Sequence, residues 1–200
     1  MTALAYGAYL RWAGLSRSLW VDEAWVANSA SEDELQQVFF YEGSLQTSPP
    51  VFLLLVRGVV ALLGPANETY RLVPFLFGLL GMVAFAFVLN SRLPRHYAFL
   101  GTMLLFFSPR AIFYSYTLKP YIGELAVAVG LLFLLWRYTD NPSNSRYVAL
   151  TVSLLISMPL AYATVFLVPG LALGLWLTPA QSRFRRAVVL TAAAGSLLEY

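Results

Sequence analysis

The chain has 200 residues, of which 59% are hydrophobic and 12% are charged, and its formal net charge is +3 at pH 7. A soluble domain has about 45–50% apolar and about 25% charged residues, so the composition excludes an ordinary soluble protein and favours a membrane protein. The sequence contains no cysteine, which excludes disulfides and thiolate metal sites. In a membrane protein the placement of basic residues reports orientation, and we expect no nucleic-acid partner.

Apolar runs separated by short polar clusters follow one another along the chain. A membrane-spanning helix needs about 20 mostly apolar residues, and residues 72–89 and 147–178 contain no charge. The second run is too long for one span, so we expect two short spans with a turn near Ser157-Met158-Pro159. The sequence predicts an all-α, polytopic transmembrane helical bundle, one transmembrane domain over residues 1–200, whose external loop at about 17–70 contains short surface helices. The predicted spans are about 1–16, 72–90, 97–108, 120–136, 147–158, 163–178 and 187–200.

Both ends of the chain are abrupt. The first 15 residues lack the basic start and the small-residue cleavage site of a signal peptide. An apolar run begins at residue 187, and the sequence stops at Tyr200. We therefore expect the chain to be the N-terminal portion of a longer protein.

Arginine-rich clusters predict which polar segments face the cytoplasm. They occupy residues 92–96, 137–146 and 183–186, and an even number of predicted spans separates each from the next. Residues 17–49 have six acids and one arginine, so we place this segment on the opposite, external face. Residues 51–63 are 13 mostly apolar residues interrupted by Arg57, which predicts a helix along the membrane surface rather than a span. This orientation predicts a multi-pass protein of the cell (inner or plasma) membrane.

The acids of the external segment fall into two groups. Ser31-x-x-Glu34 is a capping-box pattern, and Glu32, Asp33 and Glu34 would then lie in the first turn of a solvated helix over about 31–42. Asp22 and Glu23 have two interpretations. Asp22 could be the N-cap of a short helix that ends near residue 30. Alternatively, a carboxylate between Trp20 and Trp25 is partly desolvated and suits the role of a general base.

Four stretches of the sequence resemble motifs of one family, in the family's order. They are S-L-W-V-D-E-A-W at 18–25, S-P-P-V-F-L-L-L at 48–55, E-T-Y-R-L-V-P at 68–74, and Ser108-Pro109 followed by Tyr114-Ser115 and Lys119-Pro120-Tyr121. Over about residues 15–125 the chain resembles the GT-C superfamily of glycosyltransferases, of the protein O-mannosyltransferase and aminoarabinose-transferase type. These are polytopic enzymes that use polyprenyl-phosphate-linked sugars.

The resemblance implies an inverting transfer of a sugar from a polyprenyl-phosphate donor to an extracytoplasmic lipid, glycan or protein acceptor. Asp22 would be the catalytic base, and Glu23 would help to place the acceptor or a divalent cation. No cofactor is firmly expected, although Mg²⁺ or Mn²⁺ would suit these oxygen ligands. The donor phosphate would be bound by Arg71, Lys119 and Arg57. Basic side chains at span ends also reach to lipid headgroups, an explanation that suits Arg110 best.

Two other classes of protein remain open. Where bacterial members of the family often have Gln-Glu, this chain has Tyr116-Thr117-Leu118, so a second external acid is missing. The chain could therefore be a catalytically incomplete relative that binds polyprenyl phosphate or partners another membrane subunit. A transporter would place its ionisable residues near mid-membrane. Here the acids lie mostly in the external segment, which favours chemistry at the membrane surface.

Overall fold

A computed structural model of the chain describes residues 2–41 and 48–177, and every regular element within these ranges is an α-helix. The all-α prediction is therefore confirmed for this part of the chain. The helices are α1 (Thr2–Trp12), α2 (Val21–Ser31), α3 (Leu35–Phe39), α4 (Pro50–Leu63), α5 (Asn67–Arg92), α6 (Arg95–Phe106), α7 (Pro109–Ser115), α8 (Tyr121–Asp140), α9 (Asn144–Ser157) and α10 (Thr164–Leu177).

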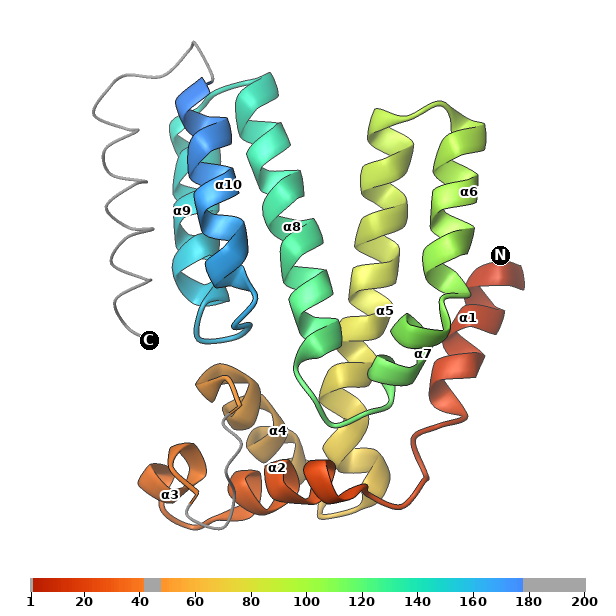
Figure 1. Cartoon of the computed structure of the whole chain (residues 1–200), viewed down its shortest axis with the longest axis vertical. Helices are drawn as coiled ribbons and strands as arrows, with labels where there is room; N and C mark the ends of the chain where they lie inside the picture. Colours follow the sequence, from red (N-terminus) through yellow and green to blue (C-terminus); the bar gives the residue numbers. More distant parts are fainter. Residues whose placement is uncertain (1, 42–47, 178–200) are drawn as a thin grey trace.

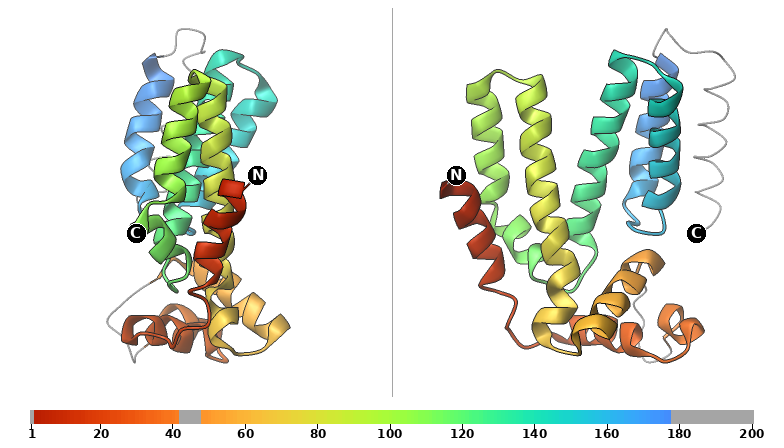
Figure 2. Two further views of the ribbon diagram at one scale, coloured as in Figure 1. Left: turned by 90° about the vertical axis from the view of Figure 1, so that its right-hand side faces the viewer. Right: turned by 180° about the vertical axis from the view of Figure 1, so that it is seen from behind.

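The helices form two layers (Figure 1). α5, α6, α8, α9 and α10 stand side by side, whereas α2, α3 and α4 lie across one end of this upright group, as the view from behind in Figure 2 also shows. The N-terminal turns of α5 extend into the α2–α4 layer. We call this the site end of the molecule, and the end with the α5–α6 and α8–α9 turns the arginine end.

The upright helices include candidates for membrane spans. α5 has 26 residues and contains an 18-residue window with a mean hydropathy of 2.5, and α8 has 20 residues with a mean hydropathy of 1.5 over such a window. These two helices are long and apolar enough to cross a bilayer, and a third span results if α6 and α7, which bend by 54° at Ser108, count as one. α9 and α10 have 14 residues each, a length of about 21 Å against about 30 Å of hydrocarbon.

Local sequence signals explain most of the helix boundaries. Pro50 occupies the first turn of α4, where a missing N–H costs nothing, and Gly64 ends the helix with a φ of +85°. The Ser108 hydroxyl accepts a hydrogen bond from the Ala111 N–H and so starts α7. The predicted turn near Ser157-Met158-Pro159 lies between α9 and α10, at residues 158–163.

The acidic segment 31–42 differs from the prediction. Ser31 is the last residue of α2, and its hydroxyl contacts the Ala27 carbonyl and the Tyr70 hydroxyl at 2.7 and 2.8 Å instead of capping a new helix. The helix that follows, α3, has only five residues and begins at Leu35. The capping-box prediction was wrong because a contact with α5 takes the hydroxyl on which the motif depends.

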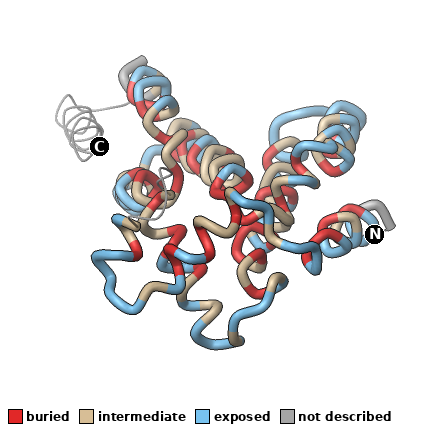
Figure 3. Tube along the Cα trace, turned by 60° about the horizontal axis from the view of Figure 1, so that its bottom comes forward, coloured by how far each residue is buried: buried red, intermediate tan, exposed pale blue. Residues whose placement is uncertain are grey.

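Two apolar clusters pack the described helices, one within the upright group and one between the two layers. One joins α8, α9 and α10 around Tyr138, Leu150 and Met158. The other joins the α2–α4 layer to α5 and to the segment between α7 and α8; its buried members are Val26, Ala27, Ala30, Val38, Phe52, Leu53, Val56, Val73 and Leu118. Figure 3 shows buried residues alternating with exposed ones along the helices, and mostly exposed residues in the loops.

Small residues allow α7 to pack closely against its neighbours. A Cβ atom added to Gly78 of α5 would collide with the Ser115 side chain of α7, and one added to Gly14 would collide with the Tyr116 ring. Glu124 in the first turn of α8 accepts a hydrogen bond of 3.4 Å from the Ala163 N–H and so joins α8 to the α9–α10 turn. The close packing at Gly78 and Gly14 places α7 and the residue after it against α5 and the segment before α2, at the site end.

A candidate active site between α2, α7 and α8

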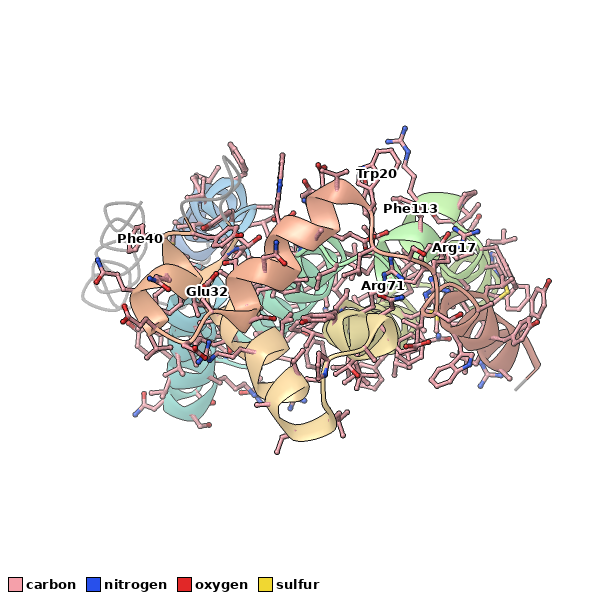
Figure 4. The ribbon with its side chains drawn as sticks, turned by 90° about the horizontal axis from the view of Figure 1, so that it is seen from below. Arg17, Trp20, Glu32, Phe40, Arg71 and Phe113 are labelled. Carbon is pink, nitrogen blue, oxygen red and sulfur yellow. The ribbon has the colours of Figure 1, made fainter. Side chains whose placement is uncertain are left out.

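A cavity of about 580 Å³ lies at the site end, bordered by the segment before α2, the start of α2, α7 and the start of α8. This volume is within the range of about 300–1,000 Å³ that is typical of small-molecule sites. Its lining residues are Arg17, Ser18, Trp20, Asp22, Glu23, Arg71, Phe113, Tyr114, Tyr116, Thr117, Lys119 and Tyr121. Viewed from below, Arg17, Trp20, Arg71 and Phe113 surround the start of α2, whereas Glu32 and Phe40 lie at the other end of the layer (Figure 4).

Asp22 and Lys119 face each other on the wall of this cavity. Lys119 Nζ lies 3.9 Å from Asp22 Oδ2, although the two residues are far apart in the sequence. The Asp22 side chain is 47% exposed and the Lys119 side chain 6% exposed. Burial lowers the pKa of Lys119, while the neighbouring carboxylates of Asp22 and Glu23 oppose this shift.

Glu23 has surroundings opposite to those of Asp22. Its carboxylate accepts four hydrogen bonds: Oε1 from Arg71 Nε at 2.9 Å and the Leu118 N–H at 2.7 Å, and Oε2 from Arg71 Nη2 at 2.7 Å and the Trp20 N–H at 3.0 Å. Burial alone would raise the pKa of Glu23, but the hydrogen bonds from Arg71, Trp20 and Leu118 lower it overall. A carboxylate has about four acceptor positions, so this one is fully used.

Arg71 is equally committed to the protein. Besides its two bonds to Glu23, Nη1 donates to the carbonyls of Leu15, at 2.9 Å, and Arg17, and Nη2 donates to the Ser18 carbonyl at 3.0 Å. These five hydrogen bonds use all five N–H donors of the guanidinium. The side chain is 3% exposed. In this conformation Arg71 has no donor left for a phosphate.

Arg57 lies outside the cavity. It projects from α4 and donates to the carbonyls of Glu32 and of Asp33, the latter at 3.0 Å, just beyond the C-terminal end of α2. A cation at this position stabilises the negative end of the helix dipole. The structure thus brings together Asp22, Glu23, Arg71 and Lys119 from the predicted site residues, but not Arg57.

The start of α2 shows why adjacent acids have different surroundings. The N-cap is Trp20, and the Glu23 side chain bonds the Trp20 N–H, as the third residue of a capping box does. Asp22, one position earlier in the helix, points a different way and lines the cavity. The interpretation of Asp22 as the N-cap was therefore wrong. The N-cap position belongs to Trp20, and the carboxylate that accepts the Trp20 N–H belongs to Glu23.

Sequence reasoning missed two features of the cavity. Arg17 lines it, with its guanidinium carbon 5.5 Å from the centre of the Tyr116 ring. Phe113 and Tyr114, and Tyr114 and Tyr121, make edge-to-face pairs with ring centres 5.3 and 5.1 Å apart, and these rings form an aromatic wall. The available signal for Arg17 was that it is the one basic residue in an otherwise acidic segment.

The donor set gives little support to a metal site. Within residues 2–41 and 48–177, no group of three or more histidine, cysteine, aspartate or glutamate side chains could hold a metal ion. Of the two acids predicted as ligands, Glu23 has its acceptor positions filled by N–H groups, which leaves Asp22. Any Mg²⁺ or Mn²⁺ at this position would therefore be held by this one carboxylate together with waters and a substrate phosphate.

No protein family, characterised protein or solved structure matches this chain significantly.

Proposed function

We propose that this chain is the donor-binding portion of a membrane glycosyltransferase that moves a sugar from a polyprenyl-phosphate donor to an extracytoplasmic acceptor. One observation supports this function above the others: a carboxylate and an ammonium group, Asp22 and Lys119, lie 3.9 Å apart on the wall of an aromatic cavity next to apolar helices. Transfer from a lipid-linked sugar phosphate needs a base for the acceptor, a cation for the phosphate and an apolar surface for the lipid, all at the surface of a membrane.

The reaction assigns a different task to each charge. An acceptor hydroxyl attacks the anomeric carbon while its proton passes to the Asp22 carboxylate, and the bond from that carbon to the phosphate oxygen breaks. The phosphate leaves with growing negative charge, which Lys119 stabilises together with Arg17. One direct displacement inverts the configuration at the anomeric carbon. Arg17 takes the place of Arg71 and Arg57 in this proposal. Arg71 lines the cavity but all its donors are used within the protein, and Arg57 lies outside the cavity.

The aromatic wall fits the rest of the donor. Trp20 is 71% exposed, and Phe113 and Tyr121 are 46% and 43% exposed. The Trp20 and Tyr121 rings combine an apolar face with a polar N–H or O–H group, and the Phe113 ring adds apolar surface. Such a surface suits a sugar ring and the first isoprene units of its carrier, at the level where the lipid headgroups lie.

Lipid binding can be measured before the sugar and acceptor are known. The full chain in lipid nanodiscs should bind a radiolabelled polyprenyl monophosphate better than the matching polyprenol. Lys119→Gln should weaken binding of the phosphate by roughly tenfold or more, since it removes a charge-assisted hydrogen bond. Arg137→Gln at the arginine end is the matched control. Equal binding of phosphate and alcohol, or equal losses in both variants, would contradict the proposal.

The alternative function is a catalytically incomplete relative that binds polyprenyl phosphate or partners another subunit. The buried Glu23–Arg71 pair favours this alternative over a transporter. It fastens α2 to α5 at the site end, where a transporter would need a path for its substrate. Normal lipid binding together with no sugar transfer from any polyprenyl-phosphate donor would support this alternative.

A further inference from the structure

The Glu23 carboxylate connects the chain segments that carry Asp22 and Lys119. Glu23 directly follows Asp22, and it accepts a hydrogen bond from the N–H of Leu118, which directly precedes Lys119. The two reactive side chains are 97 positions apart in the sequence, but Asp22 is next to the residue that carries this carboxylate, and Lys119 is next to a residue whose N–H is bonded to it.

The contact to Leu118 fixes the segment between α7 and α8. The Leu118 side chain is fully buried in the cluster that joins α2, α4 and α5, so this residue is held both by its side chain and by its N–H. Lys119 follows immediately, and its own N–H donates to the Thr117 carbonyl at 2.7 Å. The direction in which Lys119 leaves the backbone therefore depends on the bond between Leu118 and Glu23.

The contact to Trp20 fixes the other partner. Glu23 caps the first turn of α2 through the Trp20 N–H, and Asp22 lies within that turn. Arg71 then fastens the carboxylate to α5 with two bonds and fastens segment 15–18 with three more. Every polar atom of the Glu23–Arg71 pair is used, so neither side chain is free to take part in the reaction.

We propose that Glu23 is a positioning residue, held by Arg71, that sets Lys119 opposite Asp22. It does so by accepting hydrogen bonds from the N–H of Leu118, next to Lys119, and from the N–H of Trp20, at the start of the helix that carries Asp22. This role rests on the proposed function of the cavity. It differs from a catalytic role because the hydrogen bonds from Arg71, Trp20 and Leu118 leave the Glu23 carboxylate no acceptor position for a substrate. A glutamine at this position has one acceptor oxygen, and its NH₂ group would face Arg71 or the Leu118 N–H, which both donate.

The absence of cysteine permits a direct test in the full-length chain in membranes. The double variant Asp22→Cys/Lys119→Cys is treated with a short bifunctional thiol reagent, and the cross-linked peptides are quantified by mass spectrometry. Because both charges are removed, any remaining proximity comes from the frame rather than from their attraction. The control pair, Arg92→Cys/Asp140→Cys, replaces a salt bridge at the arginine end. No sugar donor is used, so failure of the proposed function would not affect the result.

Adding Glu23→Gln should reduce cross-linking of the 22/119 pair by about tenfold, as expected for loss of a charge-assisted hydrogen bond, and leave the 92/140 pair unchanged. Glu23→Asp keeps the charge but is shorter by one methylene, so it should give an intermediate loss at 22/119. Unchanged cross-linking at 22/119 in both variants would overturn the proposal. An equal loss at both pairs would also overturn it, because Glu23 would then support the whole fold rather than the site.

Discussion

The two ends of α5 present the same pair of groups in opposite surroundings. At the site end, Arg71 and Glu23 are 3% and 5% exposed. They make two hydrogen bonds with each other and five with nearby backbone groups. At the arginine end, Arg92 and Asp140 form a similar two-bonded pair but are 32% and 55% exposed. An ion pair in water contributes little to stability, whereas a buried pair that loses one partner leaves an uncompensated charge. Only the first pair can therefore hold a site in shape.

The largest expected difference between the ends concerns the exposed acids. Asp22→Asn should reduce sugar transfer by about 10²–10⁴-fold, because the amide cannot accept the acceptor's proton. Binding of polyprenyl phosphate and the melting temperature should change little. Asp140→Asn, also an exposed acid, should leave transfer unchanged. The assay is transfer of labelled sugar from polyprenyl-phosphate donors in nanodiscs. Full transfer by Asp22→Asn would remove Asp22 from the mechanism.

Truncation of each arginine tests the effect of burial on stability. Arg71→Ala leaves Glu23 buried without its cation and should lower the free energy of unfolding by about 3–5 kcal/mol. Arg92→Ala breaks an exposed pair and should cost at most about 1 kcal/mol. Denaturant titration of the two variants in the same detergent measures the difference. Similar losses in the two variants would mean that burial does not distinguish these pairs.

Acid should remove the stability that Glu23 contributes at the site end. Because the pKa of Glu23 is lowered in the folded chain, its contribution to stability is present above the usual carboxyl pKa and is lost as the pH falls through the lowered value. The melting temperature of the native chain should therefore drop more between pH 6 and pH 3 (about the range of carboxyl titration) than that of Glu23→Gln. Parallel curves for the two proteins would contradict this prediction.

Alkali should weaken phosphate binding at Lys119. Burial lowers the pKa of this lysine, so it loses its proton, and with it its attraction for the donor phosphate, at a lower pH than an ordinary lysine. Binding of polyprenyl phosphate should fall as the pH approaches 10, roughly the usual lysine pKa. Lys119→Arg should bind the lipid with little dependence on pH, because a guanidinium keeps its charge. Identical pH profiles for the lysine and arginine forms would exclude Lys119 as the phosphate ligand.

Sequence reasoning reached the helical class and several of the residues around the cavity, but not their partners. Asp22 and Lys119 were predicted as site residues, Asp22 from its apolar flanks and both from a family resemblance, and both line the cavity. The roles assigned to Glu23 and Arg71 depended on side chains being available, which only the three-dimensional contacts reveal. Ser31 shows the same limit, since a local capping pattern gave way to a contact with Tyr70 of α5.

An extracytoplasmic active site requires that the site end and the arginine end lie on opposite sides of a membrane, with the site end outside the cytoplasm. Val21→Cys places a thiol next to Asp22 at a position that is 61% exposed, and His96→Cys places one at the exposed arginine end. A membrane-impermeant thiol reagent applied to intact cells should label the first variant and should label the second only after permeabilisation. The opposite result, or labelling of both variants from the same side, would contradict an extracytoplasmic glycosyltransferase site.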